Sequence, residues 1–243
     1  MDTRRHREGR REPDHHARLN ANVPRGLLVV FEGAEGAGKS TQLRRLAECL
    51  GAAGRNVVAV REPGGTVVGD EIRRILLDPE SDIVPRAEAL LFMASRAQLV
   101  EREIRPALEE GAIVLVDRFF LSTYAYQGVG RGLPEEALRQ ANAMATNGLV
   151  PDLTLLLTIP VERGMARVGA RDRGLDRIET VELEFHERVA RAFETFASHE
   201  WQAAHHECGP IALINATGGE RDVFALVLAE LHARWPGNFP PRD

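Results

Sequence analysis

The stretch Gly33-Ala34-Glu35-Gly36-Ala37-Gly38-Lys39-Ser40, followed by Thr41, decides the fold because it fits the pattern G-x-x-x-x-G-K-[ST] without a gap. Its glycines permit positive φ angles, so that successive backbone N–H groups can face an anion at the start of a helix. We therefore expect residues 33–41 to bind phosphate, with Lys39 on the β- and γ-phosphates and the Ser40 hydroxyl on Mg²⁺. The alternative is a glycine-rich turn with an incidental lysine.

The residues on either side of this stretch supply the context that a phosphate-binding loop requires. Residues 27–31 are a short apolar run typical of a buried strand, and the apolar residues between 39 and 50 recur at helical spacing. A strand, a glycine-rich loop and a helix in that order form the P-loop unit. Lys39 is also the only lysine of the chain, which favours a role that a planar guanidinium fills poorly.

Length, charge and cysteine content limit the remaining possibilities. With 243 residues the chain suits one large α/β domain, and its net charge of −5 provides no general attraction to nucleic acid or to a membrane. Residues 1–26 carry several arginines but no apolar segment, so we expect a disordered basic extension, no secretory signal and a cytoplasmic protein. Cys49 and Cys208 are too few for a disulfide framework or a metal site, and we expect both in the core.

Four further apolar runs predict strands, at residues 56–60, 112–116, 153–158 and 211–214. Helical patterns separate them, and strands that alternate with helices predict a parallel sheet with right-handed crossovers. The predicted fold class is therefore α/β: a P-loop NTPase domain over residues 27–235, with a five-stranded parallel sheet flanked by helices. Residues 236–243 would form a C-terminal tail.

Charged residues follow two of these strands, at the edge where open α/β sheets bind ligands. Arg61 follows the second strand beside a Pro-Gly-Gly turn that could present it to an anion, although a solvated arginine in a plain loop is an alternative. Asp117 follows the third strand, where P-loop enzymes place an acid on the Mg²⁺ side; it could instead cap the next helix. Arg118 beside it can clamp a second phosphate group.

Two further segments carry residue types that suit a nucleotide. Phe92 and Arg96 are four apart in a predicted helix and share one face, which suits a planar base and its phosphate; a core aromatic and a surface charge are the alternative. Residues 167–179 combine glycines with several arginines whose buried partners are not apparent. This composition predicts a mobile lid over phosphates, or a solvated charged loop.

Six motifs in order make the chain resemble the bacterial thymidylate kinase family over roughly residues 27–235. The motifs are FEGAEGAGKST (31–41), REPGGT (61–66), LLFMASRAQLV (90–100), DRFFLSTYAYQGVGRG (117–132), PDLTLLLTIP (151–160) and RGLDRIE (173–179). The chain differs from the family pattern at Thr158, where an acid is frequent, and in its basic N-terminal extension. The resemblance implies a homodimer that transfers the γ-phosphoryl group of ATP to dTMP in the presence of Mg²⁺.

The same resemblance implies roles for individual residues. Phe92 would stack on thymine and Arg96 would contact the base, while Arg61 and Arg118 would hold the phosphate of dTMP. Glu35 would reach the sugar 3′-hydroxyl. The positions that would line the base and sugar are Thr123, Tyr126 and Gln127.

Arginines in the lid rather than in the P-loop resemble the bacterial subtype whose lid supplies the catalytic arginine. Arg173 is the first candidate for that role and Arg171 the second. Two other functions stay open: a different P-loop deoxynucleoside or nucleoside monophosphate kinase, and a nucleotide-dependent switch that binds a protein. The switch is disfavoured because the chain has no Asn-Lys-x-Asp motif.

Overall fold

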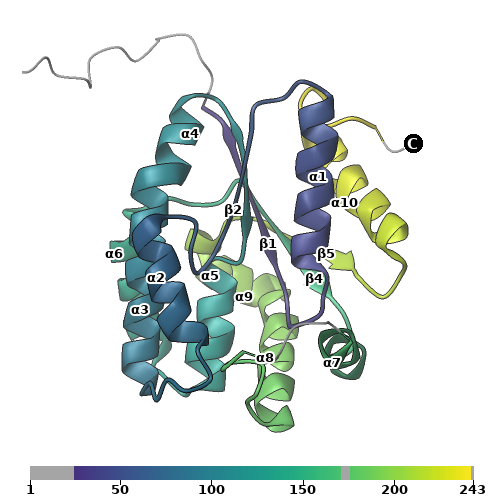
Figure 1. Cartoon of the computed structure of the whole chain (residues 1–243). Coiled ribbons are helices and arrows are strands. Elements are labelled where there is room, and N and C mark those ends of the chain that lie inside the picture. Colours follow the sequence, from purple (N-terminus) through teal and green to yellow (C-terminus); the bar gives the residue numbers. More distant parts are fainter. Residues whose placement is uncertain (1–24, 171–175, 242–243) are drawn as a thin grey trace, which may run out of the picture.

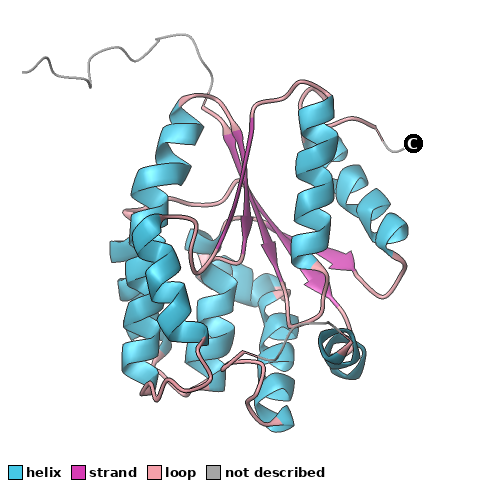
Figure 2. Cartoon of the chain, viewed as in Figure 1, coloured by secondary structure: helices cyan, strands magenta, loops and turns pink. Residues whose placement is uncertain are grey.

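The computed structural model describes residues 25–170 and 176–241, and these fold around the predicted five-stranded sheet (Figures 1 and 2). The strand order is β2-β3-β1-β4-β5, and every neighbouring pair is parallel. All strands therefore end at the same edge. The strands are β1 (Leu27–Glu32), β2 (Val57–Arg61), β3 (Ile113–Asp117), β4 (Leu153–Thr158) and β5 (Ile211–Asn215).

Helices cover both faces of the sheet, as alternation of strands and helices requires. The α-helices are α1 (Lys39–Ala52), α2 (Val67–Leu77), α3 (Pro85–Leu99), α4 (Arg105–Glu109), α5 (Phe120–Thr123), α6 (Glu135–Thr146), α7 (Val161–Gly169), α8 (Leu183–Phe196), α9 (His199–Ala204) and α10 (Glu220–Arg234). Two π-helical turns, η1 (Val100–Ile104) and η2 (Tyr124–Gly130), and the 3₁₀ turn η3 (His206–Cys208) join some of them. In Figure 1, α1 and α10 lie together on one face of the sheet.

Alternation of side chains along the central strand β1 divides the interior into two cores. Leu28 and Val30 point into the core that includes α8, whereas Val29 and Phe31 point into the core under α1 and α10. All four side chains are fully buried, which explains why the strand is a continuous apolar run rather than an alternating one.

The packed domain extends slightly beyond both predicted boundaries. Gly26 donates its backbone N–H to the Leu108 carbonyl at 2.8 Å, and Arg25 pairs with Asp152 at 2.9 Å, so these two residues belong to the domain. At the other end Phe239, in the predicted tail, is 1% exposed within the core under α10. Burial of this large aromatic side chain holds residues 236–241 against the domain.

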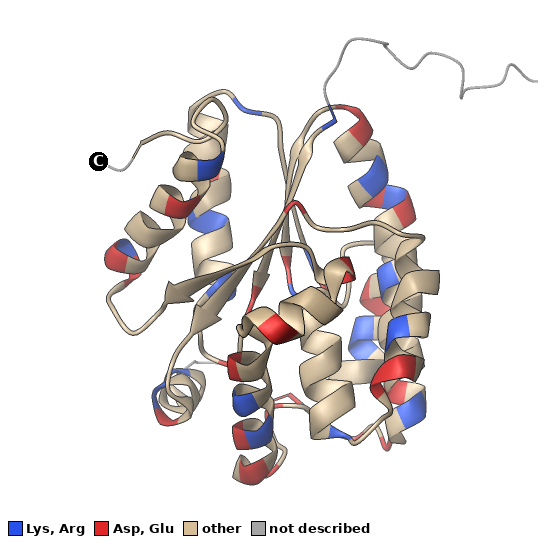
Figure 3. Ribbon diagram, turned by 180° about the vertical axis from the view of Figure 1, so that it is seen from behind, with Lys and Arg blue, Asp and Glu red and all other residues tan. Residues whose placement is uncertain are grey.

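Surface charge and the cysteines agree only in part with the sequence analysis. Figure 3 shows residues of both signs spread along the outer helices. None of the helices in residues 25–170 and 176–241 combines the length and the apolar character needed to cross a bilayer. Cys208 is buried as expected, but the prediction is wrong for Cys49, which is only half-buried because Leu46 and Leu50 occupy the buried side of α1.

Candidate active site

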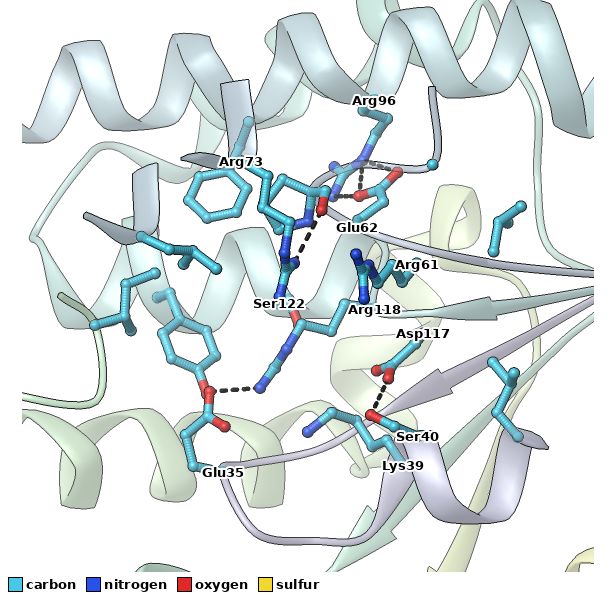
Figure 4. Close-up of a pocket in the computed structure, with 18 of the residues that line it drawn as sticks. Glu35, Lys39, Ser40, Arg61, Glu62, Arg73, Arg96, Asp117, Arg118 and Ser122 are labelled. Carbon is cyan, nitrogen blue, oxygen red and sulfur yellow. Dashed lines mark hydrogen bonds and ion pairs between the residues drawn. The ribbon is translucent and has the colours of Figure 1, made fainter. Parts of the chain in front are cut away.

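A pocket of about 1020 Å³ opens at the carboxyl edge of the sheet (Figure 4). Its wall combines the loop between β1 and α1, the ends of β2 and β3, and one face of α3. Among the residues expected from the sequence, those that line it are Glu35, Gly36, Gly38, Lys39, Ser40, Thr41, Arg61, Phe92, Arg96, Asp117, Arg118, Thr123, Tyr126 and Gln127. Segments far apart in the chain therefore contribute to one cavity.

The loop of residues 33–41 takes a shape that only glycine allows at two positions. Gly33 has a φ of +138°, and a Cβ there would lie 2.3 Å from the Leu157 carbonyl oxygen. Gly36 has a φ of +70°, and a Cβ there would lie 2.0 Å from the carbonyl oxygen of Gly164 in α7. The alternative of an incidental turn does not explain these constraints, because they press the loop against β4 and α7 and fix the direction of α1.

Lys39 begins α1 and turns its ammonium group back toward the loop. Its Nζ donates to the carbonyl oxygens of Gly33 and Ala34, both at 2.9 Å. Burial, together with the charge of Arg118, lowers the pKa of Lys39 to about 8. A buried cation whose hydrogen bonds to the described residues go to neutral carbonyls has a strong preference for an added anion.

Ser40 and Asp117 meet on the other side of the loop. The Ser40 hydroxyl donates to the Asp117 carboxylate, which joins the start of α1 to the end of β3 (Figure 4). The alternative role of Asp117 as a helix cap is wrong, because α5 begins after Phe119 with no side-chain cap bond. A hydroxyl and a carboxylate side by side are the oxygen ligands that Mg²⁺ prefers, so this pair fits such an ion.

Arg118 stands over the P-loop in a strained backbone conformation. Its φ is +71°, which is uncommon outside glycine and frequent at functional sites. The guanidinium pairs with Glu35 at 2.5 Å and donates to the Gly33 carbonyl at 3.2 Å. Burial lowers the pKa of Arg118, but nearby groups, first Glu35 and then Tyr126, Asp117 and Glu32, together outweigh burial, so the pKa lies above its ordinary value. Tyr126 donates to the same Glu35 oxygen at 3.0 Å.

Glu32 is a site-forming residue that the sequence analysis missed. This fully buried carboxylate at the end of β1 accepts the backbone N–H of Phe119 at 2.7 Å and that of Ser122 at 3.0 Å. It therefore holds the loop that carries Arg118. No sequence signal marks this role, because Glu32 and Ser122 are 90 positions apart.

Arg96 lies at the far wall of the pocket and is 1% exposed, so its alternative role as a surface charge is wrong. Its Nη2 pairs with the Glu62 carboxylate at 2.6 Å and also donates to the Phe119 carbonyl at 2.8 Å. Nε bonds Glu62 again, and Nη1 donates to Thr123 and Asn142. All five N–H bonds of the guanidinium thus have protein acceptors, so a direct contact from Arg96 to a base requires one acceptor to be shared.

Arg61 differs from Arg96 because it is exposed and its guanidinium bonds none of the described residues. Arg73 on α2 lies beside it, was missed from the sequence, and donates to the Pro63 carbonyl at 2.9 Å. Burial, together with the charge of Arg61, lowers the pKa of Arg73. The spacing of Arg73 from the buried Gly69 and Leu76 places it on the inner face of α2, a signal that could have identified it.

The predicted lid is only partly described. Arg171 and Arg173, its two candidate catalytic arginines, lie outside the described residues. Of the others, Arg167 donates to the Gly36 carbonyl at 3.3 Å, and Arg177 pairs with the buried Glu88 at 2.7 Å. The interpretation that the lid arginines have no buried partners is therefore wrong for Arg177, whose partner lies 89 positions away.

The geometry defines a class of protein: a P-loop phosphotransferase with room for a second ligand beside the phosphate loop. Residues 31–206 match the family model for thymidylate kinase. The chain is 45% identical over 212 residues to a thymidylate kinase of Deinococcus radiodurans, covering 87% of this chain and 99% of that protein. It is 52% identical over 172 residues to one from Exiguobacterium, covering 70% of this chain and 80% of the relative.

Similarity in structure agrees with these matches. The crystal structure of thymidylate kinase from Ehrlichia chaffeensis superposes with a TM-score of 0.66 at 27% identity, covering 86% of this chain and 100% of that one. The chain belongs to the thymidylate kinase family.

Proposed function

We propose that the protein transfers the γ-phosphoryl group of ATP to the 5′-phosphate of dTMP, giving dTDP and ADP. An acceptor phosphate oxygen would form the new bond to the γ-phosphorus, while the bond to the bridging oxygen of ADP breaks. Family membership supports the reaction. The observation that carries the proposal is that one pocket is lined by the P-loop, by Arg61 at the end of β2 and by the half-buried ring of Phe92.

At the P-loop end, Lys39 and Arg118 would face the charge that accumulates on the transferred group. Positioning and cations account for most of the catalysis of such reactions, since the transition state is loose. Ser40 and Asp117 would hold Mg²⁺, which when bound neutralises phosphate charge. Arg173, or Arg171, would add a further cation from the lid and help to exclude water.

For the acceptor, Arg61 would bind the phosphate of dTMP, because an unpaired guanidinium can take a bidentate anion without first losing a partner. Phe92 would stack on the base, with Arg96 near it and with Thr123, Tyr126 and Gln127 around the base and sugar. Glu35, already bonded by Tyr126 and Arg118, would accept the 3′-hydroxyl.

A panel of acceptors tests this proposal. Purified protein with ATP and Mg²⁺ is offered dTMP, dUMP, dCMP, AMP and thymidine, and kcat/KM is measured for each. A methyl group in an apolar slot changes kcat/KM by about 10–200-fold, so dTMP should lead and dUMP should follow. Faster turnover of dCMP or AMP than of dTMP would favour a broader nucleoside monophosphate kinase, and turnover that requires a protein partner would favour a switch.

We further propose that the protein is a homodimer in the cytoplasm. Leu90 on α3 is 61% exposed and Met144 on α6 is 77% exposed, and these two helices pack against each other. Large apolar side chains on adjacent helices favour a contact between copies. Light scattering on the purified protein should give twice the mass of one chain, and Leu90→Glu with Met144→Glu should shift it to one.

A further inference from the structure

A buried carboxylate lies behind the pocket wall and has no part in the proposed phosphoryl transfer. Glu88 on α3 is 1% exposed, and its Oε1 accepts a hydrogen bond from Gln127 Nε2 at 2.9 Å. Its Oε2 pairs with Arg177 at 2.7 Å and with Arg131 at 3.2 Å. Two cations and one amide therefore converge on a single side chain.

These partners keep the Glu88 carboxylate ionised. Burial alone raises the pKa of Glu88, but the hydrogen bonds from Gln127 and Arg177 and the charge of Arg131 outweigh burial, and the pKa lies below its ordinary value. An ionised carboxylate has no proton to donate and can only accept hydrogen bonds. At neutral pH, the Glu88 carboxylate therefore only accepts hydrogen bonds.

This restriction determines which way the Gln127 amide points. Oxygen and nitrogen of an amide are assigned from the hydrogen-bond network, and here an acceptor-only neighbour requires the NH₂ group. The opposite orientation would bring two acceptor oxygens together in a buried place, which is unfavourable. Gln127 is 2% exposed and lines the pocket, and none of the described residues bonds its Oε1. The carbonyl oxygen is thus turned away from Glu88 and available to a ligand.

We propose that Glu88 is a positioning residue for base selection, which holds Gln127 so that its Oε1 faces the pocket and accepts the N3–H of a pyrimidine. Thymine and uracil carry hydrogen on N3, whereas cytosine presents a lone pair there. A fixed oxygen therefore rejects cytosine through an unpaired, repelling contact. This inference rests on the proposed function, because it requires the base of the acceptor nucleotide to lie beside Gln127.

The test is Glu88→Gln, with kcat/KM measured for dTMP and dCMP. A glutamine at position 88 can donate as well as accept, so the Gln127 amide becomes free to turn and offer NH₂ to cytosine N3. We expect the ratio of kcat/KM for dTMP to that for dCMP to fall about tenfold or more. Glu88→Asp keeps an acceptor-only group and should keep most of the ratio.

Glu136→Gln is the matched control. Glu136 also accepts a hydrogen bond from a glutamine amide, that of Gln140 at 2.9 Å, and also pairs with an arginine, but it lies on the exposed surface of α6. This substitution should leave the ratio unchanged. Equal losses for dTMP and dCMP in a folded Glu88→Gln protein would overturn the inference and leave the proposed function intact. Absence of transfer to dTMP in the wild type would overturn the proposed function instead.

A second measurement uses the wild-type protein alone and does not depend on its activity. Hydrogen exchange of the side-chain amides is followed by NMR in the wild-type protein, with exposed Gln140 as the internal reference. We expect one Hε2 proton of Gln127 to exchange far more slowly than either of those of Gln140. Equally fast exchange would show that Glu88 does not hold the amide.

Discussion

The two ends of the pocket hold their cations in opposite ways. At the P-loop end, the hydrogen bonds that the Lys39 ammonium group donates within the described residues go only to the carbonyl oxygens of Gly33 and Ala34. At the far wall, Arg96 is paired with a buried carboxylate and has a protein acceptor for every N–H. Neutral carbonyls are weak partners for a charge, so Lys39 can bind an anionic ligand strongly. Arg96, which belongs to α3, connects this helix to three other elements: the loop after β2, helix α5 and helix α6.

This difference leads to opposite expectations for substitutions. Removing the P-loop cation should lower activity strongly and leave the fold intact, whereas removing the far-wall cation should lower the free energy of unfolding. Arg61, which lines the same pocket and bonds none of the described residues, should behave like the P-loop cation.

The largest effect is expected for Arg96→Ala. Glu62 would remain as a buried charge without a partner, and breaking such a pair costs about 3–5 kcal/mol of the free energy of unfolding. Denaturation in urea measures this change. Arg139→Ala, which removes an arginine from an exposed pair with Glu136, is the control and should leave the midpoint unchanged.

The double variant Arg96→Met with Glu62→Gln sharpens this expectation. It removes both buried charges, so it should be more stable than Arg96→Ala. If Arg96→Ala unfolds at the same urea concentration as the wild type, the far wall is no more structural than the P-loop, and the contrast between the two ends is wrong.

The next effect is expected for Lys39→Ala, which should lower kcat by about 10²–10³-fold without lowering Tm. Lys39→Arg should lose most activity too, because a planar guanidinium does not fit a site shaped for a point charge. Arg45→Ala is the control for the loss of activity in both variants, because Arg45 lies on the same helix but pairs with Glu220 of α10. Retention of a tenth of the wild-type turnover in either Lys39 variant would contradict the P-loop assignment.

The P-loop end was predictable because its determinants are adjacent in the sequence. Residues 33–41 form one unbroken stretch, and the strand and helix beside it have clear periodicity. The parallel sheet followed from the same alternation, and all five strands were located within one residue of their ends. Local patterns carry this information without any knowledge of the tertiary structure.

The far wall was only partly predictable because its contacts are long-range. Spacing identified Phe92 and Arg96 on one face, but Arg96 lies 34 positions from Glu62 and 46 from Asn142. The carboxylates of Glu32, Glu62 and Glu88 are buried, and no local pattern in the sequence marks them as internal. A charged residue becomes internal only when distant partners satisfy it, and no local pattern reports those partners.

Arg61→Ala should give a smaller effect than the Lys39 variants. Loss of one charged hydrogen-bonding partner of the dTMP phosphate is worth about 1.5–3 kcal/mol, so KM for dTMP should rise by about 10–100-fold. KM for ATP and Tm should not change, since Arg61 bonds no described residue. A marked fall in Tm would show that Arg61 is a structural cation like Arg96. The expectation that it serves to bind a ligand would then be wrong.

The smallest effect is a pH dependence, which only the P-loop end should show. With a pKa of about 8, Lys39 in the free protein loses its charge as the pH rises through that value. The kcat/KM for ATP follows the free enzyme, so it should fall about tenfold between pH 7 and pH 9. Bound phosphates favour the ammonium form, so kcat should change less. Arg61→Ala should keep the same profile.

Stability should change with pH in the opposite direction. The pKa of Lys39 is lower in the folded state than the ordinary 10.5, so between about pH 8 and 10.5 the unfolded state binds more protons and the free energy of unfolding rises with pH. Below pH 8 the buried charge therefore makes the wild type less stable than Lys39→Met. The difference in Tm between the two proteins should shrink from pH 8 to pH 10. If the difference in Tm and the kcat/KM for ATP both stay constant with pH, Lys39 keeps an ordinary pKa. The P-loop end would then hold its cation no differently from the far wall.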